Sequence, residues 1–256
     1  MALEFRSVTK TFPTTSGGEM TAVSDVSFRV EKGEFVSVVG PSGCGKSTIL
    51  SMTAGLYQPT RGEVLVSDQP VMGPNAHVGF MLQKDLLLPW RSIITNIEFG
   101  LEARGVSKAD RRARAMEELE ACHLAGFEHH YPYQLSGGMR QRAALARTLA
   151  IDPEIILLDE PFSALDAQTK LLLQNAFAKT ISEAGKTTLL ITHDLAEAVL
   201  MSDRILVLSE RPGSVIAEIK IDLPHRDEPI KRRVLPEVSD YAAQLFKYLK
   251  LEEKAA

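Results

Sequence analysis

The stretch "GPSGCGKST" at residues 40–48 constrains the fold of this chain more than any other feature. It follows the apolar run "FVSVV" at 35–39, which is typical of a buried strand, and a helical pattern begins at Lys46 and ends before Pro59. Phosphate-binding loops occur in this context, a glycine-rich turn between a buried strand and a helix. We therefore expect an α/β fold of the P-loop NTPase type, with a mainly parallel sheet and helices on its faces.

The residue types of this loop predict its chemistry. Gly40, Gly45, Lys46 and Ser47 match the spacing G-x-x-x-x-G-K-[ST]. The glycines let backbone N–H groups close around phosphates, the Lys46 ammonium supplies a positive charge to the outer phosphates, and the Ser47 hydroxyl is suited to ligate Mg²⁺. Cys44 is expected to fill space rather than to react. The residues expected to hold the nucleotide here are Gly40, Pro41, Ser42, Gly43, Cys44, Gly45, Lys46, Ser47 and Thr48.

Composition narrows the classes of function. The chain has 256 residues, a net charge of −4 and 45% hydrophobic residues, which are values of an ordinary globular protein. The negative net charge argues against a nucleic-acid binder, which would show a strongly basic face. Two cysteines make no disulfide framework and indicate a reducing, cytoplasmic compartment. No apolar run approaches the roughly 18 residues that span a bilayer, and the N-terminus does not resemble a secretory signal. Any role at a membrane is therefore expected to depend on a partner.

Hydrophobic periodicity indicates a helical insertion. Short apolar runs predict strands in the first 40 residues, partly antiparallel, whereas residues 92–150 show three helical patterns and hardly any strand signal. A simple βαβ crossover takes roughly 30 residues, yet residues 40–154 separate the strand at 35–39 from the strand at 155–158. We therefore expect a helical lobe inserted between neighbouring elements of one sheet.

Strands and helices alternate over the rest of the chain. Further strands are predicted at 3–8, 26–30, 63–67, 78–82, 187–192 and 204–209, and further helices at 166–184, 194–201 and 236–250. The expected organisation is one domain over 1–256, with a nucleotide-binding core at 1–83 and 151–220, a helical lobe at 84–150 and a C-terminal tail at 221–256 that packs on the sheet.

Acidic and polar side chains follow the ends of several predicted strands. "IILLDE" at 155–160 brings Asp159 and Glu160 to the carboxyl end of a strand, where open α/β sheets bind ligands. Asp159 is placed to hold the Mg²⁺ shell, and Glu160 to polarise a water against the γ-phosphate. His193 in "LLITHD" should lie on the same edge, and Gln83 follows another strand, where its amide could reach metal or water. From position alone, each of these residues also fits a structural role.

A second anion-binding element is predicted in "LSGGMRQR" at 135–142. Ser136, Gly137 and Gly138 are small residues at the start of a helical pattern, and the free N–H groups of a helix start point towards an anion. A plain helix cap would explain the same three residues without a ligand. The chain therefore raises the question of why it would carry two phosphate-binding elements.

Phosphate loops also occur in GTPases and in nucleotide kinases. A GTPase would ordinarily add a guanine-reading N/T-K-x-D element, and "TKLL" at 169–172 lacks the acid. The sequence therefore favours ATP over GTP.

The phosphate loop, Gln83, "LSGGM", "LLDE", "SALD" and "THD" follow one another in this order. With these motifs the chain resembles the ATP-binding subunit of an ABC transporter over about residues 3–220. The stretches "LLLPW", "HYPYQLSGGMRQRAALAR" and "PFSALDAQT" are similar to importer ATPases of the nitrate, sulfonate and taurine group. One alternative is a soluble ABC ATPase acting in DNA repair or on ribosomes, which would show coiled-coil or zinc-hook insertions or a second cassette. Another is a regulatory module without turnover, which Glu160 and His193 disfavour.

The resemblance implies a fold, roles and partners. The fold would be the ABC ATPase fold, and two subunits would pair head to tail, so that Ser136, Gly137 and Gly138 of one close on ATP held by the other. Phe12 stands where the family usually has a tyrosine that stacks on adenine, and Met139 stands where many members have glutamine. The implied roles are phosphate and metal contact for Lys46, Ser47 and Thr48, sensing of Mg²⁺ and water for Gln83, Mg²⁺ binding for Asp159, general base for Glu160, γ-phosphate contact for His193 and a place at the dimer seam for Asp166.

The resemblance also places the subunit at the cytoplasmic face of the inner membrane, bound to an integral permease that takes up a small solute from a solute-binding protein. "KDLLLPWRSI" at 84–93 holds an apolar cluster, Leu86 to Trp90, with the only tryptophan of the chain and no helical or strand period. Such a cluster on a connecting segment is typical of an interaction surface. We expect a permease helix to dock there. The alternative is a loop that folds onto the core of the lobe.

Overall fold

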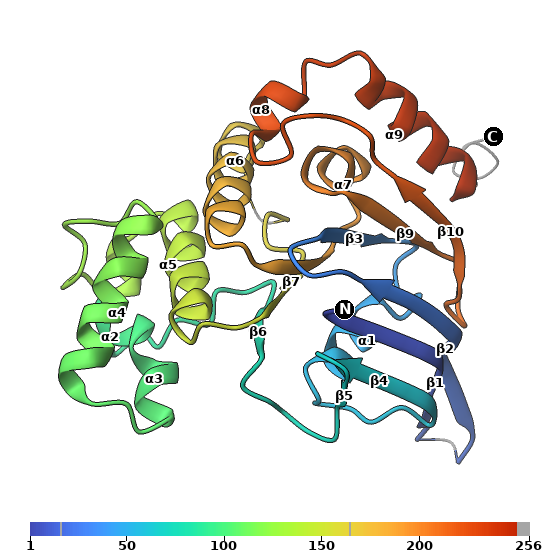
Figure 1. The fold of residues 1–256 in the computed structure, drawn as a ribbon, viewed down its shortest axis with the longest axis horizontal. Helices are drawn as coiled ribbons and strands as arrows, with labels where there is room; N and C mark the ends of the chain where they lie inside the picture. The colour runs from blue at the N-terminus through green and yellow to red at the C-terminus, as the bar shows by residue number, and fades with distance from the viewer. Residues whose placement is uncertain (16, 164, 250–256) are drawn as a thin grey trace.

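A computed structural model describes residues 1–15, 17–163 and 165–249 (Figure 1). Its strands form two sheets that share a layer of buried apolar side chains. The smaller sheet has the order β2-β1-β4-β5 and consists of β1 (Leu3–Pro13), β2 (Glu19–Val30), β4 (Arg61–Val66) and β5 (Gln69–Pro70). It is antiparallel, with Leu3 opposite both Val30 and Val66. The predicted N-terminal antiparallel region is therefore confirmed.

The larger sheet has the order β10-β9-β3-β8-β7-β6. Its strands are β3 (Phe35–Val39), β6 (Val78–Met81), β7 (Ile155–Asp159), β8 (Thr187–Ile191), β9 (Arg204–Leu208) and β10 (Val215–Lys220). All neighbours run parallel except β9 and β10. On β3, Val36 and Val38 face the smaller sheet while Phe35 and Val39 face the helices. Because both faces are covered, these strands are continuous apolar runs in the sequence.

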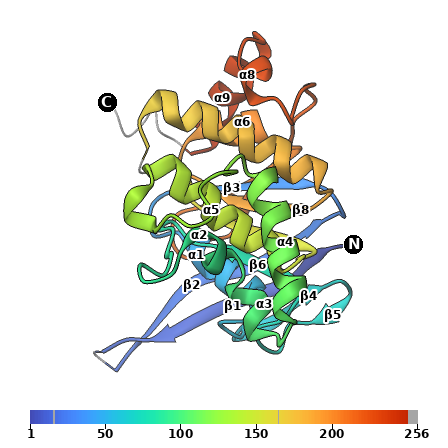
Figure 2. The same ribbon diagram turned by 90° about the vertical axis from the view of Figure 1, so that its left-hand side faces the viewer.

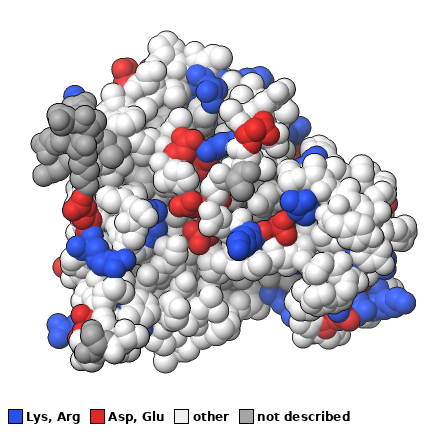
Figure 3. Space-filling view, turned by 180° about the vertical axis from the view of Figure 1, so that it is seen from behind, with Lys and Arg blue, Asp and Glu red and all other residues white. Residues whose placement is uncertain are grey.

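Helices cover both faces of the larger sheet. On the side of the smaller sheet lies α1 (Lys46–Thr53), and on the opposite side lie α6 (Ala167–Glu183) and α7 (Leu195–Met201) (Figure 1). No helix within the described part of the chain is both long and apolar enough to cross a membrane. Lys and Arg side chains are interspersed with Asp and Glu on the face shown in Figure 3, so that this face presents no continuous basic surface.

The helical insertion lies between β6 and β7. It contains α2 (Ile93–Ile97), α3 (Phe99–Ala103), α4 (Lys108–Ala121), the short 3-10 helix η1 (Pro132–Gln134) and α5 (Gly137–Ala150). Figure 2, in which this lobe faces the viewer, shows α4 and α5 in front of the larger sheet. β6 and β7 are neighbours in the sheet, so the expected insertion of helices between neighbouring elements of one sheet is confirmed. The strand β3, which precedes the phosphate loop, is separated from β7 by β8, which comes later in the chain.

The C-terminal part contains two elements that were not expected. The strand β10 has six residues of which one is buried, and the helix α8 (Pro229–Arg232) has four residues, so neither shows a clear hydrophobic period. The predicted helix at 236–250 corresponds to α9 (Glu237–Tyr248), and its last expected residue lies outside the described ranges. α9 packs on α7, with Val238 and Leu245 in the core, and its last residue Tyr248 lines a cavity with Ile216 of β10.

Candidate functional site

The phosphate loop joins β3 to α1, and two of its glycines adopt left-handed backbone conformations. Gly43 has φ +75° and Gly45 has φ +106°, values that residues with side chains rarely adopt. A Cβ on Gly45 would lie 2.4 Å from Cγ1 of Val23 and 2.8 Å from the carbonyl oxygen of Ala22. Strand β2 therefore packs directly against the loop and fixes its curve.

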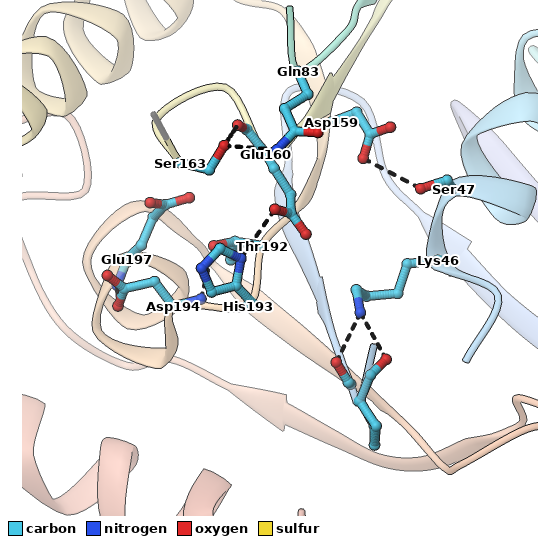
Figure 4. Close-up of polar contacts among 12 residues, drawn as sticks. Lys46, Ser47, Gln83, Asp159, Glu160, Ser163, Thr192, His193, Asp194 and Glu197 are labelled. Atoms are coloured by element: carbon cyan, nitrogen blue, oxygen red, sulfur yellow. Dashed lines mark hydrogen bonds and ion pairs between the residues drawn. The ribbon is translucent and has the colours of Figure 1, made fainter. Parts of the chain in front are cut away.

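Lys46 places a cation in the mouth of this loop (Figure 4). The side chain is buried, and its Nζ donates hydrogen bonds to the carbonyl oxygens of Gly40, at 2.8 Å, and Pro41, at 2.9 Å. An ammonium group has three hydrogens, and the third faces only the weak sulfur acceptor of Cys44, at 3.9 Å. Cys44 is buried behind the loop, and this burial raises the pKa of its thiol. The geometry suits the expected roles of Lys46 as a phosphate contact and Cys44 as a packing residue.

Ser47 and Asp159 face each other at the start of α1 and the end of β7. The Ser47 Oγ lies 3.5 Å from Oδ1 of Asp159 (Figure 4). Burial, together with the neighbouring charge of Glu160, raises the pKa of Asp159. A hydroxyl and a carboxylate are the oxygen ligands that Mg²⁺ prefers. No group of three or more His, Cys, Asp or Glu side chains in the described ranges could hold a metal alone, so phosphate oxygens and water would supply the other ligands.

Glu160 and His193 meet at the same edge of the sheet. Glu160 follows β7 directly with φ +47°, a strained conformation for a non-glycine residue, and its amide donates to the carbonyl oxygen of Ile191 at 3.0 Å. Its Oε2 lies 3.0 Å from Nδ1 of His193 (Figure 4). His193 is 63% exposed, while Glu160 is more enclosed. The imidazole therefore stands at the open side of the carboxylate.

A polar network behind His193 fixes the turn that carries it. Asp194 caps α7 by accepting a hydrogen bond from the amide of Glu197 at 3.1 Å. Lys170 on α6 reaches both acids, with Nζ at 2.8 Å from Oδ2 of Asp194 and 2.8 Å from Oε2 of Glu197. Burial raises the pKa of Glu197, and the Lys170 charge opposes that shift. Lys170 was not expected at the site, because a lysine on a helix is most often a solvated side chain.

Gln83 connects to the same turn. Its Nε2 donates to Oγ of Ser163 at 3.0 Å, and that hydroxyl donates to the carbonyl oxygen of Glu160 at 3.0 Å (Figure 4). The amide nitrogen is therefore used on Ser163, which leaves the amide oxygen, the atom that can ligate a metal, for the expected role. Ser163 was not singled out from the sequence.

A cavity of about 430 Å³ opens over the phosphate loop. Phe12 stands at its rim, held edge-on by Tyr57 with ring centroids 5.3 Å apart. Met20, Ala22 and Arg211 also line the cavity, and sequence reasoning missed them because β2 and the β9–β10 turn meet the loop only in the folded chain. The lining consists of Phe12, Met20, Ala22, Ser42, Gly43, Gly45, Lys46, Ser47, Thr48, Glu160, His193 and Arg211.

The other predicted anion-binding element lies elsewhere. Ser136 caps α5 by accepting a hydrogen bond from the amide of Met139 at 3.3 Å. Ser136 and Gly138 line a separate cavity of about 270 Å³, shared with residues of α6. Figure 1 shows α5 in the helical lobe and α1 between the two sheets. Within one chain, Ser136, Gly137 and Gly138 therefore do not meet the phosphate loop.

Comparison with known proteins decides the family. The family profile described as "ABC transporter" matches residues 23–163. The chain belongs to the ABC transporter family. It is 45% identical, over 98% of its length and 92% of the relative, to an uncharacterized ABC transporter ATP-binding protein of Methanocaldococcus jannaschii. It is 47% identical, over 80% of each chain, to the taurine import ATP-binding protein of Yersinia pestis.

Solved structures of ABC cassettes share the fold. A dimeric, post-hydrolysis state of an ATP-binding cassette bound to ADP and Pi superposes with a TM-score of 0.74 at 35% identity, covering 86% of this chain and 98% of that one. A dimeric bacterial ABC transporter cassette matches with the same TM-score and coverage at 36% identity. The ABC ATPase fold and the resemblance to the nitrate, sulfonate and taurine group are confirmed. This ABC protein binds nucleotide and is an ATPase coupled to transport.

Proposed function

We propose that this ABC ATPase energises an importer for a small oxyanion solute such as nitrate, a sulfonate or taurine. The taurine import relative, at 47% identity, supports this class of solute. In the proposed assembly a homodimer binds an integral permease at the cytoplasmic face of the inner membrane. A solute-binding protein delivers the solute to that permease. Closure of the dimer on two ATP molecules drives the transport step.

One observation carries the assignment of the ATP site: the cavity over the phosphate loop also contains Glu160 and His193. We assign phosphate binding to Lys46 and to the N–H groups of residues 40–48. Ser47 and Asp159 would hold Mg²⁺, which would supply positive charge to neutralise the phosphates. Glu160 aligns and deprotonates the attacking water, and His193 contacts the γ-phosphate.

We propose that Ser136, Gly137 and Gly138 complete the site of a second subunit. Ser136 and Gly138 line a different cavity of their own chain from the one over its phosphate loop. The dimeric cassette structures support a pair of this kind. Asp166 caps α6 by accepting hydrogen bonds from the amides of Gln168 and Thr169, at 3.2 and 3.0 Å, and we place it at the seam.

The segment Leu86 to Trp90 has the features of a docking surface. Leu87 is buried in the lobe, so the alternative of a loop folded onto the core holds for this residue, whereas Trp90 is 72% exposed. Asn96 fixes the loop by accepting a hydrogen bond from the Leu88 amide at 2.7 Å and donating to the Leu88 carbonyl at 3.1 Å. A cavity of about 410 Å³ lies beside Trp90. We propose that a short cytoplasmic helix of the permease docks here.

The position of Gln83 explains how nucleotide and permease could be coupled. It directly precedes the docking segment, contacts the Glu160 turn through Ser163, and its carbonyl oxygen accepts a hydrogen bond from Gln141 of α5 at 3.3 Å. In this proposal 1–83 and 151–220 form the core that holds ATP, and 84–150 form the lobe that moves the permease.

Uptake in the host tests the importer assignment. A strain in which Lys46→Ala replaces the wild-type chain should lose uptake of one labelled solute among nitrate, taurine and an aliphatic sulfonate, because phosphate binding is lost. A strain carrying Arg233→Gln, an exposed change after α8, serves as the control. Unchanged uptake of all three solutes in the Lys46→Ala strain would contradict the proposed class of solute.

A further inference from the structure

Arg211 is a charged residue of the nucleotide cavity that no motif of the chain accounts for. It lies in the turn between β9 and β10, and this turn is bound to β2. The Gly213 amide donates to the carbonyl oxygen of Ala22 at 3.0 Å, and the Ser24 amide donates to the carbonyl oxygen of Gly213 at 2.9 Å. The turn is thereby held beside the phosphate loop, although its residues are far from that loop in the sequence.

The guanidinium of Arg211 lies across the outer side of the loop. Its Nε donates to the carbonyl oxygen of Gly43 at 2.9 Å, and its Nη1 lies 3.0 Å from the Met20 sulfur. A Cβ on Gly43 would be 3.1 Å from Nη2. A guanidinium has five N–H donors; toward the described residues, one donates to the loop carbonyl and a second faces a weak sulfur acceptor. Arg211 and Lys46 are the two cationic side chains among the described residues of the cavity lining.

We propose that Arg211 is a nucleotide-binding residue whose guanidinium contacts the polyphosphate chain of ATP from the rim of the cavity. The inference rests on the proposed assignment of this cavity to ATP. Its Nε bond to Gly43 orients the planar group, and such an oriented guanidinium matches phosphate oxygens with paired, charge-assisted hydrogen bonds. The Nε bond to Gly43, a residue of the phosphate loop, places the charge within reach of the phosphates. The Nη1 contact is to Met20, which pairs with Phe12 across β1 and β2, so the binding test compares phosphate and base contacts.

Equilibrium binding to the purified full-length chain tests the proposal. The ligands are Mg²⁺-ATP, Mg²⁺-GTP and AMP, and the variants are Arg211→Gln, Arg211→Lys and Lys46→Ala. Arg233→Gln removes the same charge from an exposed position outside the cavity and is the matched control. We expect Arg211→Gln to raise the Kd for ATP by about 5- to 10-fold, the range of a charge-assisted hydrogen bond at an exposed site. AMP binding should change less than about 2-fold, and the ratio of ATP to GTP affinity should stay constant.

Turnover provides a second measurement. The KM for ATP should rise with Kd in Arg211→Gln while kcat changes less, because the contact is made to bound substrate before hydrolysis. The Arg211→Lys variant keeps the charge but loses the paired geometry, so its Kd should be intermediate. If Arg211→Gln does not fold, as judged by circular dichroism and thermal unfolding, the comparison of ATP and AMP on Arg211→Lys carries the test.

Several results would overturn the inference. An ATP affinity of Arg211→Gln equal to that of Arg233→Gln would show that the guanidinium does not touch the nucleotide. An equal loss for AMP and ATP would assign Arg211 a purely structural role in the loop, and a changed ATP-to-GTP ratio would assign it to the base. In each case Lys46→Ala should still weaken ATP binding. If Lys46→Ala also binds ATP normally, the assignment of the cavity itself fails.

Discussion

Replacing Glu160 with glutamine should separate ATP binding from ATP hydrolysis. The amide has the shape of the carboxylate, so the cavity is unchanged, and its oxygen still accepts a hydrogen bond from Nδ1 of His193, now 3.0 Å from Oε2. The lost function is proton removal, and a general base contributes about 10²- to 10⁴-fold to a rate. We therefore expect turnover to fall by about that factor.

ATP affinity should stay constant or improve in the same variant. Two like unit charges about 6 Å apart in a medium like water repel each other by about 0.7 kcal/mol. Loss of the negative charge of Glu160 near the phosphates therefore predicts ATP binding that is up to about 3-fold tighter. Phosphate release gives the turnover, and titration with Mg²⁺-ATP gives the Kd. The Glu160→Asp variant is the control, because it keeps a carboxylate and should lose less activity. Turnover within a few-fold of the wild type in Glu160→Gln would remove this residue from its role.

Three further predictions concern other parts of the chain. Ser136→Arg and Lys46→Ala should each abolish hydrolysis, yet mixed heterodimers should recover part of it, because one of their two sites is intact. Verified heterodimers that release no more phosphate than either variant alone would contradict a shared site. Polar substitution of Leu88 and Trp90 should leave basal ATPase activity largely intact but abolish co-purification with the permease, whereas unfolding of the variant would assign the cluster to the core. Arg232→Met should lower the free energy of unfolding by about 2–4 kcal/mol. The reason is that the buried guanidinium donates to five carbonyl oxygens, which would lose their partner. A change under about 1 kcal/mol in urea unfolding would refute this reasoning.

The sequence predicts which segments form strands and helices better than it predicts which strands lie side by side. Apolar runs such as Ile155–Asp159 are recognisable because both faces of the strand are buried. Periodicity reports which residues face a core, but not which strand lies beside which. The position of β8 between β3 and β7 follows from packing over the whole chain. The edge strand β10 escaped prediction for a related reason, since its exposed side chains carry no strong apolar pattern.

The site residues show the same contrast between local patterns, which the sequence reveals, and contacts between distant elements, which it does not. The phosphate loop is contiguous, so its chemistry is readable directly from residues 40–48. Glu160 and His193 could be placed together because the carboxyl ends of parallel strands share one edge. Lys170 and Arg211 had no comparable signal: each reaches the site across a contact between elements far apart in the sequence.

The separation of the two anion-binding elements has a consequence for the proposed dimer. In a two-fold symmetric pair, any contact of residue i with residue j is matched by a contact of j with i. If the loop of one subunit meets Ser136 of its partner, the partner's loop must meet the first subunit's Ser136. Both ATP sites then form in the same closing step. Because Gln83 joins the Glu160 turn to the segment before Trp90, that step would reach the proposed docking surfaces of both subunits together.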